Sequence, residues 1–324
     1  MHLDMIRQEV ETTYDKVKSL AGWSVDKNVV LTITSYYVTA EKEFDAVAFS
    51  RALAALKERA GWFSPLRGNL LPMMAAFLTQ SDASVEGEAE RLMDKQRTLK
   101  QAGFRNTIHS YLAAMLMDND AARFQEEADR AKKLYDAMKK QHYFLTSNDD
   151  YAYAMLLGKM GEDPVEHAKA MRSYYDALRE EGFRTGNELQ WLSQVMTYID
   201  ISFQQQLVKR AWTIFEMLRE ESKAKPVHYP MVGFLTVFDV GDEKISKIIQ
   251  LAKQLEQSKR FKWNKEMALS VAIGYVMHQL TESADQVSVS LAASVEMILQ
   301  AQQAVMAATV AAVASSSAAT SSNG

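Results

Sequence analysis

The sequence predicts an all-α protein built as an array of about seven helical hairpins of about 40 residues each. Glycine and proline are sparse, at 13 and 5 of the 324 residues, so few positions interrupt a helix. Apolar residues recur at helical spacing along most of the chain, and no stretch of comparable length alternates with the period of a strand. A glycine followed by an aromatic residue also returns at a nearly constant interval. We therefore expect an α-solenoid, with a closed α/α toroid as the alternative.

The interval is easiest to see where Ala-Gly-Trp occurs twice, at residues 21–23 and 60–62. Equivalent marks are Gly103-Phe104, Tyr143-Phe144, Gly182-Phe183 and, after a degenerate copy at 222–224, Arg260-Phe261. Successive aromatic residues lie 39 to 42 residues apart, except the last pair, whose separation of 78 equals two periods. We interpret each glycine as the left-handed end of a helix, and each aromatic residue as a side chain that packs back onto the hairpin.

Each unit is predicted to contain a charged helix followed by a more apolar one. The clearest charged helix spans 164–181, because Asp163 and Pro164 are favourable at a helix start and Gly182 at a helix end. The β-branched run VVLTIT at 29–34 lies within a longer apolar segment, which we also assign to a helix. The apolar helices, which should form an inner layer, are LPMMAAFL, SYLAAMLM, YAYAMLLG, LQWLSQVM, YPMVGFLTVF and MALSVAIGYVM.

The chain is expected to divide into a hairpin domain at 1–282, an Ala-rich C-terminal helix at 283–314 and a disordered Ser-rich tail at 315–324. The run VEMILQAQQAVMAATVAAVA is long enough to raise the alternative of a membrane anchor. Its glutamines would be unsatisfied in hydrocarbon, and no Lys or Arg flanks it to set an orientation. We therefore expect no membrane partner.

Charge and composition exclude several classes of partner and site. Lys and Arg total 37 while Asp and Glu total 41, with both signs interspersed, so no basic surface for nucleic acid is expected. The chain has no Cys, which excludes disulfides and thiolate zinc sites and fits a reducing, cytoplasmic location. The first residues include acidic side chains and no apolar core of a signal peptide. No P-loop, dinucleotide-binding, HExxH or GxSxG motif occurs, so we predict no cofactor and assign no catalytic residue.

Polar residues cluster where each apolar helix begins. The position six residues after each corner glycine, or its equivalent, is Asn28, Arg67, His109, Asn148, Glu188, His228 or Glu266. Helix capping accounts for the Asn and Asp residues, whereas imidazole is a poor N-cap and capping does not require Glu188 or Glu266. Stacked hairpins would place all of these positions on one rim. The candidate binding residues are His109, Asp149, Asp150, Asn187, Glu188, Gln190, His228, Trp263, Asn264 and Glu266.

The histidines of this set raise the question of a metal. If the array brings His109, Asp149 or Asp150, and His228 together, a mixed nitrogen and oxygen metal site or an acid–base pair is possible. The chain offers no short-range pair such as HxxxH, so the sequence leaves metal binding open.

Several segments resemble an uncharacterised bacterial family catalogued as a domain of unknown function. They are FLTSNDDYAYAMLL (144–157), GFRTGNELQWLSQVM (182–196), KPVHYPMVGFL (225–235), FKWNKEMALSVAIGYVM (261–277) and the Ala/Ser-rich end. The resemblance spans most of the chain and implies no activity, cofactor or catalytic residue.

Two functions remain open at this point. The first is a helical-repeat scaffold that binds a protein or peptide on its concave face. The alternative is an α/α toroid whose central polar pocket makes it an enzyme, or a protein that binds a small molecule or metal. Closure distinguishes them, because residues near Trp23 would contact residues near Phe261 only in a closed ring.

Overall fold

The computed structural model describes residues 3–22, 25–62, 64–68, 71–79 and 83–282. Over these residues the chain forms fourteen α-helices and four short 3-10 helices, and it contains no strand. The predicted all-α class is therefore confirmed. An open solenoid or a closed toroid stays a prediction, and Trp23, the residue chosen to distinguish them, lies outside the described residues.

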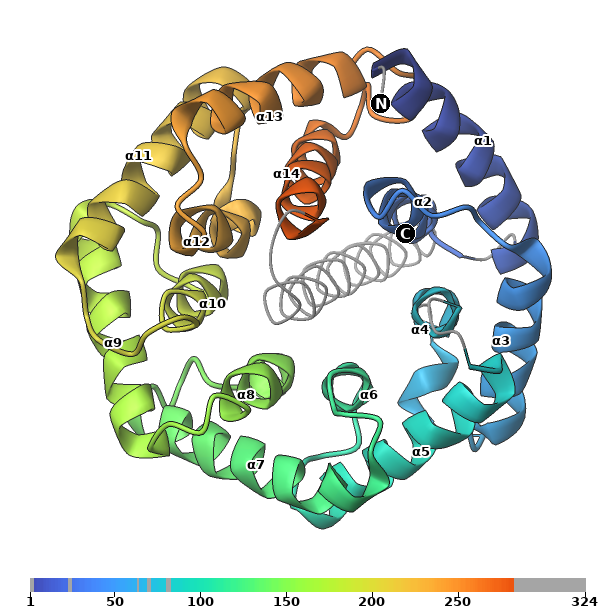
Figure 1. Cartoon of the computed structure of the whole chain (residues 1–324), viewed down its shortest axis with the longest axis horizontal. Coiled ribbons are helices and arrows are strands. Elements are labelled where there is room, and N and C mark those ends of the chain that lie inside the picture. The colour runs from blue at the N-terminus through green and yellow to red at the C-terminus, as the bar shows by residue number, and fades with distance from the viewer. Residues whose placement is uncertain (1–2, 23–24, 63, 69–70, 80–82, 283–324) are drawn as a thin grey trace, which may run out of the picture. The chain divides into compact units, whose positions relative to one another are not determined.

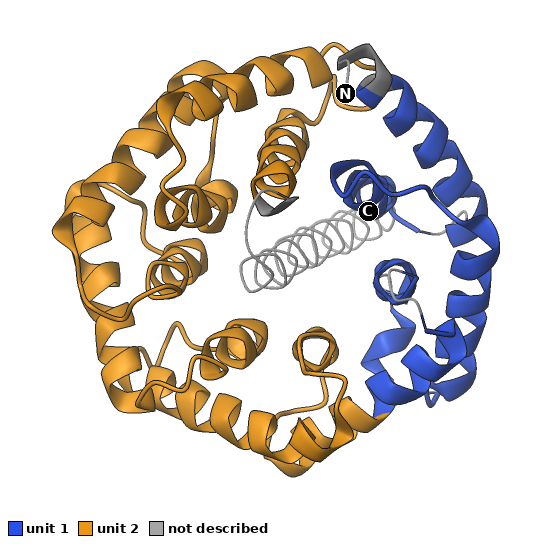
Figure 2. Ribbon diagram, in the orientation of Figure 1, with its two compact units in different colours: residues 1–93, 295–324 blue, residues 94–294 orange. Residues whose placement is uncertain are grey.

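The chain divides into two compact units, and the boundary along the sequence falls within helix α5 (Val85–Gln101) (Figure 2). Of the described residues, those up to 93 belong to the first unit and those from 94 to 282 to the second. The predicted hairpin domain at 1–282 stays a prediction, and the predicted Ala-rich helix and Ser-rich tail lie outside the described residues.

The first unit contains four complete helices, which are α1 (Leu3–Ala21), α2 (Lys27–Thr39), α3 (Ala46–Arg59) and α4 (Leu71–Leu78). The run VVLTIT lies in α2 as predicted, and its side chains are buried. Asp26 caps α2 by accepting from the backbone N–H of Asn28, and Asp45 caps α3 in the same way. The apolar run of α2 is thus helical because its start is capped and its side chains are buried.

Helices of the second unit form two layers (Figure 1). The outer layer contains α5 from residue 94 onward, α7 (Phe124–Gln141), α9 (Pro164–Glu181), α11 (Gln205–Ser222) and α13 (Asp242–Leu255). The inner layer contains α6 (Ile108–Met115), α8 (Tyr151–Gly158), α10 (Asn187–Val195), α12 (Tyr229–Val237) and α14 (Lys265–Glu282). The outer helices bury one face, whereas α8 is buried from Tyr151 to Leu157 on all sides. A helix that is apolar all round, such as α8, is suited to this inner position.

Helix α9 has the predicted bounds, and its ends have the predicted chemistry. Asp163 accepts from the backbone N–H groups of Val165 and Glu166 at 2.9 and 3.0 Å. Gly182 ends the helix with a φ of 129°, a conformation that a residue with a Cβ rarely adopts. The local sequence therefore determines both ends of this helix.

The predicted corner aromatic residue is buried at Phe104, Phe183 and Phe261, and the first two show in detail how it packs. Phe183 is buried, with its ring 4.8 Å from that of Tyr229, and the Tyr229 hydroxyl accepts from the backbone N–H of Arg184 at 3.1 Å. Phe104 is buried against Tyr151 at 4.7 Å, and the Tyr151 hydroxyl accepts from the backbone N–H after Phe104. In both cases the tyrosine begins the inner helix of the next hairpin, which is α8 for Phe104 and α12 for Phe183, so the corner joins neighbouring hairpins.

The same prediction was wrong at two other corners. Trp62 is 80% exposed and Phe144 is 97% exposed. Gly103 and Gly182 have positive φ, and the chain turns back at the residue that follows each of them. Helix α3, by contrast, is followed by Ala60, whose backbone is extended. Helix α7 ends at His142, which has a φ of −134° and no glycine beside it. Both corners lack the left-handed turn, but Phe261 is fully buried at a corner that also has no positive φ, so the turn alone does not decide whether the ring is buried.

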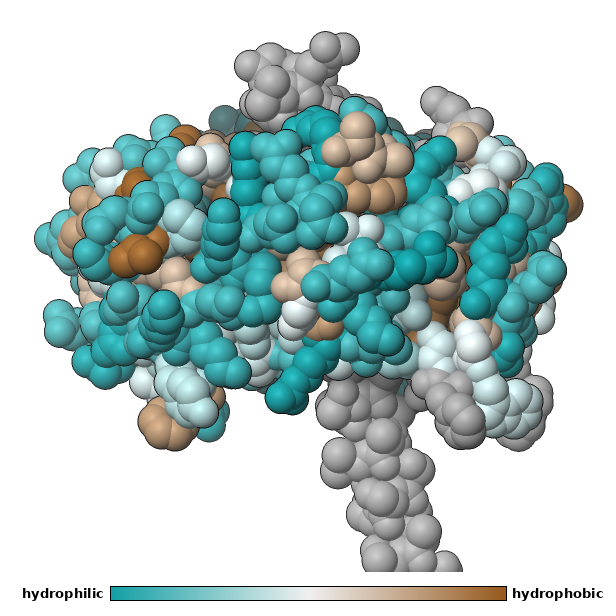
Figure 3. Space-filling model, turned by 90° about the horizontal axis from the view of Figure 1, so that it is seen from below, coloured by the Kyte–Doolittle hydropathy of each residue, from teal (hydrophilic) through white to brown (hydrophobic). Residues whose placement is uncertain are grey.

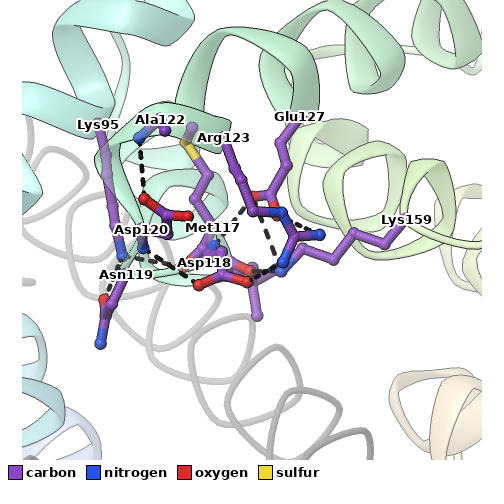
Figure 4. Close-up of polar contacts among 10 residues, drawn as sticks. Lys95, Met117, Asp118, Asn119, Asp120, Ala122, Arg123, Glu127 and Lys159 are labelled. Atoms are coloured by element: carbon purple, nitrogen blue, oxygen red, sulfur yellow. Dashed lines mark hydrogen bonds and ion pairs between the residues drawn. The ribbon is translucent and has the colours of Figure 1, made fainter.

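Loops that leave the inner helices are held by polar side chains of the outer layer. In the loop from α6 to α7, the Lys95 ammonium donates to the carbonyl of Met117 at 2.8 Å and to Asn119 Oδ1 at 2.7 Å (Figure 4). Glu127 accepts from the backbone N–H of Asp118 at 2.9 Å in the same loop. Lys95 is 5% exposed, so these contacts compensate the burial of its charge.

Figure 3 shows a face of the molecule that is mostly hydrophilic, with hydrophobic residues in small groups. Within the described part of the chain, no helix combines the length and the hydrophobicity needed to cross a bilayer.

Candidate functional site

The segments that lead into the inner helices lie along one edge of the second unit, which we call the corner rim. It comprises residues 105–109, 143–150, 184–190, 225–228 and 262–266. Each hairpin reverses the chain and the following loop reverses it again, so successive inner helices start on the same edge. Polar contacts along this rim join the start of α6 to that of α8, α8 to α10, and α12 to α14.

His109 and Asp149 form the first of these contacts. His109 Nε2 lies 2.8 Å from Asp149 Oδ1, with both side chains partly exposed. The hydrogen bond from His109 is the main reason that the pKa of Asp149 is below its ordinary value. The sequence placed both residues in the candidate site, and the structure brings them together across two hairpins.

Asp150 is the buried centre of the rim, with 1% exposure. Its Oδ2 accepts from the backbone N–H of Ser147 at 2.8 Å. Its Oδ1 accepts from Gln194 Nε2 at 2.7 Å and from Gln190 Nε2 at 3.1 Å, both on α10. A single carboxyl thus caps its own helix and joins it to the next inner helix.

Burial determines the protonation of Asp150. Removal from water raises its pKa to about 6, while hydrogen bonds from Gln194, the Ser147 backbone and Gln190 act in the opposite direction. Asp149 raises this pKa further as a like charge. At neutral pH Asp150 therefore carries a buried negative charge whose hydrogen-bond donors are all neutral groups.

The network also determines which nitrogen of His142 is protonated. Gln190 directs its Nε2 to Asp150 and Thr146, so its Oε1 is the atom 3.2 Å from His142 Nδ1. Because an amide oxygen only accepts, Nδ1 carries the proton and Nε2 is an acceptor. Burial, followed by the positive charge of Arg172, lowers the pKa of His142, which favours this neutral form.

Two acceptors of this network remain without a hydrogen-bond partner among the described residues. They are His142 Nε2 and Gln194 Oε1, and both atoms are buried. The two side chains line one small pocket of about 10 Å³ together with Thr146, Gln190 and Ser193. This volume is about that of one water-sized group, so the pocket is suited to a single small donor.

His228 has a structural role at its corner. Its Nδ1 accepts from the backbone N–H of Lys225 at 3.0 Å, and its Nε2 donates to the carbonyl of Glu266 at 3.0 Å. The expectation that capping explains this histidine poorly was wrong, because it acts from the third position of the turn, as Asp150 does toward Ser147. Both ring nitrogens are occupied, and the contacts of His228 are with α14 rather than His109.

The remaining predicted residues lie along the rim without joining the Asp150 network. Asn187 and Glu188 form the first turn of α10, where a carboxylate complements the positive end of the helix dipole. Asn264 Oδ1 accepts from the backbone N–H of Met267 at the start of α14. Glu266 pairs with the Lys225 ammonium, and the Trp263 side chain is 88% exposed.

His142, Thr146 and Gln194 belong to the site but were missed. Gln194 had a signal, because Gln190 and Gln194 lie four residues apart in a helix predicted for the inner layer and so share a face. His142 falls outside the pattern of positions six residues after a corner. Over the described residues, no three His, Asp or Glu side chains are grouped as a metal site would need.

Comparison with known proteins shows which family the chain is similar to. A family model for a protein of unknown function (DUF4003) matches residues 13–304, in agreement with the resemblance seen in the sequence. The uncharacterized protein YeaA of Bacillus subtilis (strain 168) is 28% identical over 315 residues, which cover 94% of this chain and 93% of that protein. No solved structure is significantly similar to the chain.

Proposed function

The chain belongs to the DUF4003 family, described as proteins of unknown function, and we propose from its own side chains that it is a helical-repeat scaffold of the α-solenoid type that binds a protein. We place the binding surface on the corner rim, where Asp149, Glu188 and the other predicted site residues lie. The absence of Cys supports a cytoplasmic location for this scaffold.

The observation that carries this proposal is the exposure of large aromatic side chains on the corner rim. Tyr143, Phe144 and Trp263 are 68%, 97% and 88% exposed, whereas the corner residues Phe104 and Phe183 are buried. Aromatic residues are enriched at the centres of protein interfaces, where they bury a large apolar area with little loss of side-chain entropy. Their exposure on the folded chain supports a partner that covers them.

Charge around these rings indicates the chemistry of the partner. The Lys139 ammonium lies 5.7 Å from the centre of the Tyr143 ring, and the Lys262 ammonium lies 5.4 Å from the centre of the Trp263 ring. A partner surface with an apolar centre and acidic side chains around it would match this combination.

Affinity purification from the native cell tests the proposal. The wild-type chain is compared with a Tyr143→Ser/Phe144→Ser variant and with an Ile199→Ser control. Ile199 is 58% exposed but lies in the loop after α10, at the opposite edge of the layer. We expect one protein to copurify with wild type and control and to be lost from the rim variant by at least tenfold. Equal recovery by all three chains would refute the corner rim as the binding surface.

A further inference from the structure

We propose that the cavity at the junction of α7, α8 and α9 binds a free aliphatic α-amino acid in its zwitterionic form. The cavity has a volume of about 190 Å³ and is lined by α7, the end of α8, the loop that follows α8 and the first turn of α9. It lies at the edge of the second unit opposite the corner rim, because α8 begins at that rim and ends at the cavity. Its walls offer an acceptor, a cation, an anion and an apolar surface, and each of these matches one part of an amino acid.

His167 provides the acceptor, on the α9 wall of the cavity. Its ring is 1% exposed, and its Nε2 lies 2.9 Å from the hydroxyl oxygen of Thr197. The Thr197 hydroxyl donates to the carbonyl of Gln194 at 2.7 Å, so its one proton is used and His167 Nε2 is the donor to its oxygen. Burial lowers the pKa of His167 to about 4, so the ring is neutral at pH 7 and Nδ1 keeps a lone pair. The tautomer is therefore fixed by Thr197, and it leaves Nδ1 as an acceptor.

Charges of opposite sign lie on two walls of the cavity. Lys133 belongs to α7 and Glu162 to the loop between α8 and α9, and neither forms an ion pair with another described residue. Arg130 also belongs to the α7 wall, but its guanidinium lies 2.6 Å from the Glu126 carboxylate, so this pair adds no net charge. The two remaining charges favour a ligand that carries one positive and one negative group over a simple cation or anion.

The cations of the α7 wall do not act on His167. Burial is the only cause of its lowered pKa, so the positive charges of that wall lie too far from the ring to shift it. An ammonium group can therefore donate to His167 Nδ1 and to the Glu162 carboxylate without opposition from a neighbouring cation. The carboxylate of the same ligand then faces Lys133 and the remaining N–H groups of Arg130 on α7.

Size and apolar surface define the rest of the ligand. An apolar protein cavity of about 150 Å³ binds benzene, so a cavity of about 190 Å³ accepts a slightly larger molecule, and L-valine is of this size. Leu134, Leu157 and Pro164 supply an apolar surface for a branched aliphatic side chain. Because the ligand is small and water screens the exposed charges, its dissociation constant should be on the order of 1 mM.

An NMR titration of the full chain with L-valine tests the proposal. Gly158 and Gly161 line the cavity, so their backbone amide resonances should shift with a dissociation constant on the order of 1 mM, while that of Asp150 on the corner rim stays unchanged. Two analogues of the same size each lack one charge. 2-Hydroxy-3-methylbutyrate has a hydroxyl in place of the ammonium, and L-valinamide has a neutral amide in place of the carboxylate. We expect each to bind at least tenfold more weakly than L-valine.

Three results would overturn the proposal. L-valine at about 20 mM could leave both glycine amides unshifted, which would mean that the cavity holds water only. Binding of the hydroxy acid as tightly as L-valine would show that no ammonium is recognised. Binding of L-valinamide as tightly as L-valine would show that the carboxylate is not recognised, and would assign the cavity to the amino terminus of a peptide.

Variants at exposed positions provide a second measurement. Lys133→Glu turns the attraction for the ligand carboxylate into repulsion and should weaken L-valine binding by about tenfold. Lys140→Glu makes the same charge change on the same helix outside the cavity, so this matched control should bind as wild type does. Equal affinities of these two variants would contradict the assignment of the α7 wall. Glu162→Gln should weaken L-valine binding by about threefold and leave binding of the hydroxy acid unchanged, whereas an equal loss for both ligands would contradict a contact with the ammonium.

This inference does not rest on the proposed scaffold function. The cavity lies at the opposite edge of the inner layer from the corner rim, and its assay needs no protein partner. If a Lys133→Glu chain does not fold, the comparison of L-valine with its two analogues on wild type decides the question.

Discussion

Protonation of Asp150 should make the stability of the protein depend on pH in a defined direction. Burial raises the pKa of Asp150 to about 6 from an ordinary value of 3.8. Between about pH 4 and pH 6 the folded protein therefore holds a proton that the unfolded chain has released, and this proton favours folding. The contribution is fully present below about pH 4 and is lost as the pH rises through about 6. A pKa difference of about 2 corresponds to about 3 kcal/mol.

The assay compares wild type with Asp150→Asn, whose side chain does not titrate. Urea unfolding is followed by circular dichroism from pH 4.5 to 7.5, and the free energy of unfolding of the variant is subtracted from that of wild type. Other titrating groups are shared by both proteins and cancel in this difference. We expect the difference to fall by about 2 kcal/mol over this range, because the remaining part of the contribution is already lost below about pH 4.5. A difference that stays constant to within about 0.5 kcal/mol, or that rises, would refute the account of Asp150 as a buried carboxyl.

Three further predictions test the packing. Phe183→Ala removes a buried ring that lies among other aromatic rings, and it should lower the free energy of unfolding, measured with urea, by about 3 to 5 kcal/mol. Phe144→Ala, at an exposed ring, is the control and should change it by less than about 0.5 kcal/mol. Gly182→Ala should lower the free energy of unfolding by more than about 1 kcal/mol, because its φ is 129° and a Cβ there would lie 2.8 Å from the ring of Trp212. Gly61→Ala is the control, because a Cβ at Gly61 would have no atom within 4 Å. Lys95→Met leaves two oxygens of the loop from α6 to α7 without their donor, so hydrogen exchange of that loop should be faster while exchange in α11 is unchanged.

Much of the fold followed from local sequence. Helix α9 begins and ends where Asp163, Pro164 and Gly182 predict, because capping and left-handed glycine act within a few residues. The β-branched run in α2 would by itself favour a strand, but the longer apolar segment around it correctly predicted a helix. The corner aromatic residues were predicted alike, but Phe144 and Trp62 are exposed whereas Phe104, Phe183 and Phe261 are buried, a difference that the local sequence did not reveal.

The candidate site followed the sequence only in part. His109, Asp149, Asp150 and Gln190 were chosen because polar residues recur where inner helices begin, and the structure joins them in pairs across hairpins. The sequence offered no reason to prefer the bond of Asp150 to Gln190 over a contact between His109 and His228. Such a choice depends on the separation of segments that are 40 or more residues apart in the chain.

Sequence alone determined which segments are helical, where glycine and capping residues end or begin them, and which kinds of residue border the inner layer, since these properties arise from neighbours within one or two turns. Tertiary structure decided which corner rings are buried, that His228 caps a turn, and that Asp150 holds two glutamines in one orientation. It also decided that His142 Nε2 and Gln194 Oε1 are left as acceptors beside one pocket. The physical reason is that burial and hydrogen-bond pairing depend on atoms brought together by packing, and these two properties determine the pKa of Asp150 and the tautomer of His142.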